Sequence, residues 1–266
     1  MSVPTIKFEN VTKIFKTKRQ IITAVKDFSM ELSKGEFVSV LGPSGCGKST
    51  LIRMLCDITK PTSGTIEIDG VAIDPHKKIP VETLKKIGFI FQQPNLLPWC
   101  TLRENIELPL KIFKLKGKEW EERVDYLIAM TGLTEYANAY PVEISGGMTQ
   151  RAGVARAMVH DPEILLMDEP FGALDEFLRE QLDMELLSIW EKTGKTIIFI
   201  THSVDEAILV SSRIYVMATQ PGRLIETVEI DLPRPRSLDM IVSPEFVDYG
   251  ILLKDLIGKL DLSKIK

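Results

Sequence analysis

The sequence predicts an α/β fold, and three observations support this prediction. The first is a glycine-rich stretch with the spacing G-x-x-x-x-G-K-[ST], which consists of Gly42, Pro43, Ser44, Gly45, Cys46, Gly47, Lys48, Ser49 and Thr50. The second is its context, because an apolar, β-branched run at 36–41 precedes it and a helix-like run at 51–55 follows it. The third is a set of further apolar runs that are typical of buried strands, at 87–91, 163–169 and 196–201.

A strand, a glycine loop and a helix in this order predict a phosphate-binding site. Glycines let the backbone wrap closely around phosphate oxygens, and the start of the helix adds the positive end of its dipole. Lys48 can reach the β- and γ-phosphates of a nucleotide, and the Ser49 hydroxyl can bind Mg²⁺. The complete spacing with both flanks argues against an ordinary glycine turn. The thiol of Cys46 is either reactive or simply a small tolerated side chain.

The composition is that of a globular protein. The chain has 266 residues, of which 44% are hydrophobic, and a net charge of −4. This length suits one large domain, or one domain with an inserted piece. Lysine and arginine are scattered along the chain, which gives no support for a nucleic-acid partner.

The sequence predicts a soluble protein of the reducing cytosol. No apolar run approaches the roughly 18 residues that a membrane span needs, and residues 1–10 lack the apolar core of a secretion signal. The three cysteines have neither metal-ligand spacing nor an even number for disulfides.

Residues 3–32 are expected to form antiparallel strands. Phe28, Met30 and Leu32 alternate with polar neighbours, which is the period of a half-buried strand. A polar hairpin tip is predicted at 16–19. Phe15, shortly before this tip, is either a stacking platform for an adenine ring or a core aromatic.

A helical segment is predicted at about 95–160, inserted between two strands of the core. Thr101 and Glu104 have the spacing of a capping box, and a second helix is expected to begin after Ser145, Gly146 and Gly147. The apolar group at 96–99 lies at the entrance of the segment. It forms either an exposed docking surface or part of the small core of the insertion.

Two of the predicted core strands end in side chains that carry chemistry. The run at 163–169 ends in Asp168 and Glu169, and the run at 196–201 is followed by His202. Ligands of open α/β sheets bind at the carboxyl edge of the strands. Asp168 is therefore suited to orient Mg²⁺, Glu169 to position or deprotonate a water molecule, and His202 to contact the γ-phosphate.

The remaining elements follow in a regular order. A helix is predicted at 177–192, a helix cap at 203–206 and strands near 213–218 and 224–231. A proline-rich exit at 232–236 leads to a last helix, which carries an apolar stripe of Tyr249, Leu253, Leu256, Ile257 and Leu260. This stripe is expected to pack on the body of the protein or on a partner.

With these residues the chain resembles the nucleotide-binding subunit of an ABC transporter, over nearly its whole length to about residue 236. The resemblance rests on a Walker A loop, a Q-loop glutamine, the family signature, Walker B with its catalytic glutamate, a D-loop and a switch histidine. These are matched by 42–50, Gln92, 144–148, 164–168 with Glu169, Ala173-Leu174-Asp175, and His202. The signature, Arg151 and the triplet 155–157 separate this family from other P-loop proteins.

The resemblance implies a fold and a division of the chain. The fold is a RecA-like P-loop NTPase core with an antiparallel β subdomain and an inserted α-helical subdomain. Residues 1–236 would be the ATPase domain and 237–266 a C-terminal helical extension, whose role in regulation, dimer contact or packing stays open. The signature departs from the usual L-S-G-G-Q at Ile144 and Met148. The sequence therefore leaves open how the side chain at position 148 is arranged at the site.

The resemblance also implies an activity, cofactors and partners. Two copies of the chain would sandwich two ATP molecules, with the loop of one copy facing Ser145, Gly146 and Gly147 of the other. Mg²⁺ would be bound by Ser49, Gln92 and Asp168, while Lys48, Gln92, Glu169 and His202 would act in hydrolysis. The subunit would lie peripherally on the cytoplasmic face of the membrane against an integral permease, and indirectly serve a periplasmic or extracellular solute-binding protein.

A narrower resemblance points to importers of nitrate, sulfonates or taurine, carried by 96–99, 145–148 and 220–236. The main alternative is a soluble ABC-type ATPase that is not coupled to transport. The single loop and single signature argue against the tandem type that acts in translation, and no coiled coil separates Lys48 from Asp168 as in the DNA-repair type. A P-loop kinase would not need the signature, and a non-catalytic module would not need Glu169.

Overall fold

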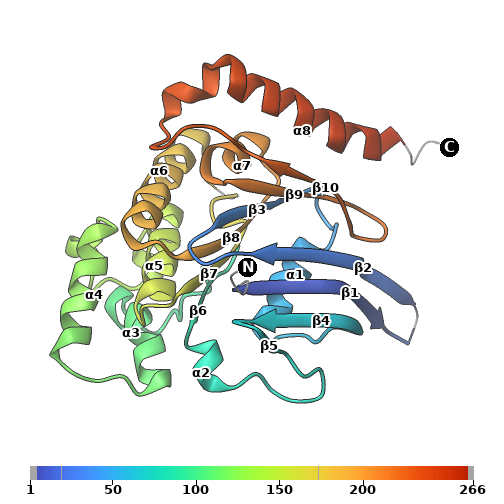
Figure 1. Cartoon of the computed structure of the whole chain (residues 1–266). Helices are drawn as coiled ribbons and strands as arrows, with labels where there is room; N and C mark the ends of the chain where they lie inside the picture. The colour runs from blue at the N-terminus through green and yellow to red at the C-terminus, as the bar shows by residue number, and fades with distance from the viewer. Residues whose placement is uncertain (1–4, 19, 173, 263–266) are drawn as a thin grey trace.

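The computed structural model describes residues 5–18, 20–172 and 174–262, with side chains as far as 258. A six-stranded sheet in the order β10-β9-β3-β8-β7-β6 lies at its centre (Figure 1). Neighbouring strands are parallel except for the antiparallel pair β9–β10. The strands are β3 (Phe37–Leu41), β6 (Ile87–Ile90), β7 (Ile164–Asp168), β8 (Thr196–Thr201), β9 (Arg213–Ala218) and β10 (Arg223–Glu229).

A second, antiparallel sheet has the order β2-β1-β4-β5 and confirms the strands expected near the N-terminus. Its strands are β1 (Ile6–Lys16), β2 (Ile21–Leu32), β4 (Ser63–Ile68) and the two-residue β5 (Val71–Ala72). The sequence did not predict β5, because two residues are too short to show a period. Residues 1–4 and Arg19 of the predicted hairpin tip lie outside the described residues.

The alternation of side chains along the central strands sorts the core into two layers. In β3, Phe37 and Leu41 join one hydrophobic cluster, while Val38 and Val40 join the other. The second cluster is closed by the antiparallel sheet and by the buried apolar side chains of α1 (Lys48–Leu55). Both faces of the sheet are thus covered, which explains why its strands are continuous apolar runs.

Helices cover the other face of the central sheet (Figure 1). Along the chain, α3 (Leu102–Phe113), α4 (Lys118–Met130) and α5 (Gly146–Met158) lie between β6 and β7, where the sequence predicted an inserted helical segment. The capping box at Thr101 is present, with both reciprocal hydrogen bonds. The buried side chains of the insertion, among them Ile106, belong to the same cluster as those of the sheet. The insertion therefore shares its core with the central sheet.

The other helices lie along the same side of the sheet or at its ends. They are α2 (Val81–Leu84), α6 (Glu176–Thr193), α7 (Val204–Val210) and α8 (Pro244–Leu262), with 3₁₀ turns at Thr134–Tyr136, Pro141–Glu143 and Leu238–Val242. α5 begins two residues before the predicted start because Ser145 caps it, with its hydroxyl accepting a hydrogen bond from the Met148 amide at 3.3 Å. The sequence did not predict the short α2 or the 3₁₀ turns, since they carry no periodic pattern.

The C-terminal extension packs on the body of the protein. Phe246 and Leu253 of α8 are buried in the cluster that covers the sheet, and other members of the predicted stripe, Tyr249, Leu256 and Ile257, pack against it. The side chain of Leu260 and residues 263–266 lie outside the described part. None of the described helices is both long and apolar enough to span a bilayer.

The proline-rich exit at 232–236 is held by a buried arginine. Arg236 is 4% exposed and donates hydrogen bonds to the carbonyls of Ile208, Leu209 and Ser211. These three carbonyls lie in and just after α7. The start of the extension is therefore fixed to the helix that follows β8.

Candidate functional site

Four chain segments meet at the carboxyl edge of the central sheet. The glycine loop follows β3, Gln92 lies two residues beyond β6, Glu169 follows β7 and His202 follows β8. These strands are parallel and adjacent in the order β3-β8-β7-β6, so their carboxyl ends lie at one edge. The topology therefore brings together residues that are far apart in the chain, from Gly42 to His202.

The glycine loop is closed by its own lysine. Lys48 is 4% exposed, and its Nζ donates to the carbonyls of Gly42 at 2.7 Å and Pro43 at 3.2 Å. Gly47 has a φ of +99° and caps α1, and a Cβ there would lie 2.6 Å from the Ala24 carbonyl. Only glycine combines this backbone conformation with such a close approach. The first amides of α1 have no partner within the helix, which suits them to phosphate oxygens.

A cavity of about 470 Å³ lies along this loop. It is lined by Ser44, Gly45 and Gly47 to Thr50 of the loop and helix, by Gln92 and Glu169, and by Ile22, Thr23, Ala24, Gln220 and Gly222. The sequence did not predict the contribution of β2 or of the turn at 220–222. The sequence signal for this contribution is Gly222 itself. The structure gives the reason for a glycine there, because a Cβ at this position would lie 1.9 Å from the carbonyl oxygen of Cys46. Sequence reasoning identified only a turn at this position.

Asp168 and Ser49 form the candidate magnesium site. The Ser49 hydroxyl donates to Oδ1 of Asp168 at 2.7 Å. Burial raises the pKa of the Asp168 carboxyl, and the hydrogen bond from Ser49 opposes this rise. A hydroxyl and a carboxylate side by side are hard oxygen donors of the kind that Mg²⁺ prefers when substrate phosphates complete its coordination. The donor set therefore fits the ion.

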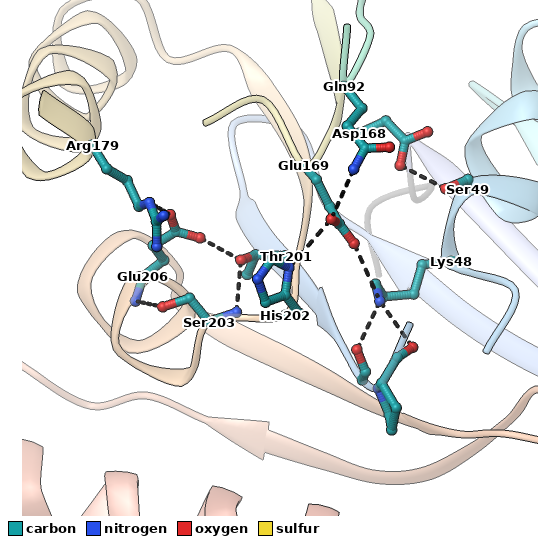
Figure 2. A network of polar contacts seen from close by, with 12 residues as sticks. Lys48, Ser49, Gln92, Asp168, Glu169, Arg179, Thr201, His202, Ser203 and Glu206 are labelled. Atoms are coloured by element: carbon teal, nitrogen blue, oxygen red, sulfur yellow. Dashed lines mark hydrogen bonds and ion pairs between the residues drawn. The ribbon is translucent and has the colours of Figure 1, made fainter. Parts of the chain in front are cut away.

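Glu169 lies at the centre of the polar contacts (Figure 2). Its Oε2 accepts from Nε2 of Gln92 at 3.3 Å and contacts Nδ1 of His202 at 3.2 Å, while Oε1 lies 3.5 Å from Nζ of Lys48. The side chain is only 15% exposed, whereas that of His202 is 48% exposed. The structure thus brings together the four residues that the sequence singled out for hydrolysis.

Other predicted site residues lie apart from this cluster. Ser145, Gly146 and Gly147 form the start of α5, and none of them lines the cavity along the glycine loop. Phe15 is 39% exposed and pairs across the hairpin with Ile22, which does line that cavity. The exposed ring is therefore not a core aromatic. The D-loop residue Ala173 lies outside the described residues.

The thiol of Cys46 is buried inside the loop. It is 1% exposed, and burial raises its pKa. Because the thiolate is the reactive form of cysteine, this environment favours the small structural side chain over the reactive thiol.

A second polar network lies next to the turn that carries His202 (Figure 2). The sequence predicted only the helix cap of this network. The Thr201 hydroxyl donates to Glu206, whose Oε1 lies 3.4 Å from Nε of Arg179. The amide of Ser203 donates to the Thr201 hydroxyl at 2.9 Å, so the network also anchors the turn that carries His202. Asp183, 2% exposed, is another buried carboxylate of this region.

Comparisons with known proteins identify the family. A family model described as ABC transporter matches residues 25–172, which include the glycine loop, Gln92, the Ser145 helix start and Glu169. The chain belongs to the ABC transporter family. It is therefore an ABC ATPase that binds ATP, as the sequence predicted.

Individual relatives of this ABC ATPase are similar over most of their length. The aliphatic sulfonates import ATP-binding protein of Bacillus cereus is 43% identical over 88% of this chain and 89% of its own. The taurine import ATP-binding protein of Pelagibacter ubique is 43% identical over 85% of this chain and 82% of its own. A solved dimeric ATP-binding cassette in a post-hydrolysis state, bound to ADP and Pi, superposes with a TM-score of 0.76 at 37% identity, covering 86% of this chain and 100% of that one.

Proposed function

We propose that this ABC ATPase powers the import of a small organic sulfonate, of the aliphatic sulfonate or taurine class, through a membrane-embedded permease. The observation that carries the proposal is the position of Glu169, whose carboxylate lies 3.5 Å from Lys48, 3.3 Å from Gln92 and 3.2 Å from His202. The solute class rests on the two import relatives, each 43% identical to this chain.

The side chains around the cavity suit hydrolysis of a γ-phosphate. Lys48 and the first amides of α1 would hold the phosphates and neutralise developing charge. Glu169 would position or deprotonate the attacking water, with Gln92 and His202 orienting its carboxylate. Asp168 and Ser49 would hold Mg²⁺, which supplies charge neutralisation when bound.

A second copy of the chain would complete the site. The start of α5, at 145–147, carries free backbone amides that do not line the protomer's own cavity. A Cβ built at Gly146 meets nothing within 4 Å in the described structure, so this helix start is open to a partner. The solved relative with ADP and Pi is dimeric. We infer that Ser145, Gly146 and Gly147 of one protomer face the ATP of the other.

The helical layer offers a surface for the permease. Trp99 is 72% exposed, so the apolar group at 96–99 does not wholly pack into the body. A separate cavity of about 340 Å³ is lined mainly by apolar side chains, which include Phe89, Phe91, Ile112 and Phe113. Such a surface suits a helix of a membrane-embedded partner, and it would hold the chain at the cytoplasmic face of the membrane. A solute-binding protein would act only through that permease.

The first experiment tests the shared site. The Glu169→Gln variant should form a dimer in ATP and Mg²⁺, measured by light scattering after size exclusion. Adding Ser145→Arg in the same background should abolish the dimer while ATP still binds. A dimer that survives this second substitution would contradict the assignment of the α5 start to the partner's ATP.

The second experiment tests the coupling to transport. Purification of the protein from membranes should also recover a polytopic permease. Deletion of the gene that encodes the chain should stop growth of the cells on alkanesulfonates as the sulfur source. A chain that hydrolyses ATP but recovers no permease would favour the soluble ATPase that is not coupled to transport.

A further inference from the structure

A second cavity, of about 220 Å³, lies on the helical side of the central sheet. Its walls come from α4, α5 and α6, together with residues at the end of β7. It shares no lining residue with the cavity along the glycine loop. The ATP-binding and hydrolytic residues described above therefore do not account for it.

The apolar side chains of the lining, called the floor below, are mostly buried. Leu127 and Met130 come from α4, Val154 and Met158 from α5, and Leu186 from α6. An apolar cavity of about 150 Å³ is large enough to bind benzene. The floor therefore has room for a short alkyl chain or a single ring.

The charged side chains of the lining, called the rim below, carry an excess of positive charge. Arg123, Arg151, Lys192 and Lys195 line it, against the carboxylates Asp161 and Glu185. Arg123 and Lys195 both contact Asp161, each at 2.8 Å. Lys192 has no ion pair within the part of the chain that the structure describes. Its ammonium group is therefore available to an anion.

Arg151 contributes a donor that the protein leaves unused. Its Nη1 donates to the Thr131 carbonyl at 3.0 Å, but its buried Nε has no hydrogen-bond partner in the described structure. A buried donor without a partner costs free energy, which an acceptor on a bound molecule would recover.

We propose that this cavity binds an amphiphilic monoanion, namely an alkyl or aryl body that carries one carboxylate or sulfonate group. The body lies on the apolar floor, and the head group pairs with Lys192 and Arg151. The inference goes beyond the proposed function and does not depend on the identity of the transported solute.

An occupant of this cavity would touch the segment that carries the hydrolytic residues. Met167 and Phe171 line the cavity, and Asp168 and Glu169 lie between them in the chain. The occupant would also bridge α4 and α6. We therefore expect binding to change the rate of ATP hydrolysis.

The test uses the full chain with butane-, hexane- and octanesulfonate and the matching carboxylates, in calorimetry below the concentration at which they form micelles. Saturable binding should strengthen with chain length for both head groups, and hexyltrimethylammonium should not bind. ATP turnover, measured in parallel, should change with the same midpoint. Absence of saturable binding, or equal binding of the cation, contradicts the proposal, and an unchanged turnover contradicts the link to Glu169.

Variants locate the binding. Lys192→Glu should weaken binding of hexanesulfonate roughly tenfold, and Glu185→Gln should strengthen it because an opposing carboxylate is removed. Ser188→Phe should fill the cavity and abolish both the binding and the change in turnover. Lys78→Glu, an exposed charge reversal on the loop after β5, is the matched control. If the three cavity variants bind as the wild type does, the site is wrong; thermal unfolding midpoints show whether each variant is folded.

Discussion

Two pairs of carboxylates, Asp168 with Glu169 and Asp183 with Glu206, differ in their surroundings. Glu169 lines the cavity along the glycine loop, and Asp168 precedes it in the chain. A hydroxyl, an amide, an imidazole and an ammonium group contact this pair (Figure 2). Asp183 and Glu206 are 2% and 8% exposed and belong to α6 and α7.

The difference indicates that the role of a carboxylate depends on its hydrogen-bond partners and its exposure to ligands, and not on whether it is an aspartate or a glutamate. The contacts of Glu169 are with groups that a nucleotide and a water molecule can replace. Glu206 instead contacts Thr201 and Arg179, which belong to the protein's own interior. The first pair is therefore expected to affect turnover, and the second pair stability.

The largest effect is expected from Glu169→Gln. Loss of the carboxylate would remove the group that is proposed to position or deprotonate water, so ATP turnover should fall by roughly 10²–10⁴-fold while ATP still binds. A steady-state phosphate-release assay measures this. Glu163→Gln is the control and should retain turnover. Glu163 immediately precedes the first residue of β7, at the end of the strand opposite to Glu169. Near wild-type turnover in Glu169→Gln would remove Glu169 from its assigned role.

Lys48→Ala should act on binding. Removal of a positioned ammonium group takes away charge-assisted hydrogen bonds to phosphate, so ATP affinity should fall roughly 10- to 100-fold. Calorimetry with ATP and Mg²⁺ measures the change, and Lys116→Ala on the surface is the control. Unchanged affinity would contradict the assignment of the loop.

Glu206→Gln should act on stability. The amide can still accept from Thr201, but Arg179 loses its counter-charge at 3.4 Å, so the free energy of unfolding should fall by roughly 2 kcal/mol. Urea denaturation measures this, with the exposed Glu135→Gln as the control. A variant with unchanged stability but lost turnover would place Glu206 with the first pair of carboxylates.

Asp183→Asn should give the smallest change at low pH, and a change that grows as the pH rises. Burial and the neighbouring Glu206 and Glu180 raise the pKa of Asp183 well above its ordinary value of 3.8, against the opposing effect of Arg179. Above pH 3.8 the unfolded chain loses this proton while the folded chain keeps it, so the residue lowers stability as pH rises through that window. An asparagine at this position would not titrate.

The asparagine variant should therefore match the wild type near pH 4 and be more stable near pH 8, as measured by urea denaturation at both values. Equal stability of the two proteins at the higher pH would show that Asp183 is ionised in the folded state.

The sequence predicted the central strands and the residues at their carboxyl ends because both signals are local. An apolar run followed by a carboxylate or a histidine can be recognised without knowledge of the fold. Glu169 and His202 were predicted in this way, and Gln92 through the family resemblance. The structure places both Gln92 and His202 in contact with Glu169.

What the sequence could not predict depends on contacts between distant segments. The contribution of Gly222 requires the approach of the 220–222 turn to Cys46, and the pairing of Arg179 with Glu206 requires the packing of α6 on α7. The shared core of the helical insertion and the sheet also follows from packing, which periodicity alone does not determine.

With Lys48 in its proposed role, the ion pair between Lys48 and Glu169 would make ATP binding an exchange of anions. In the structure the carboxylate of Glu169 lies 3.5 Å from the ammonium of Lys48, which is proposed to receive a phosphate. The carboxylate would thus compete with the phosphate for the ammonium group of Lys48. A glutamine at 169 removes this competitor, so the substitution that slows hydrolysis should also tighten the binding of ATP.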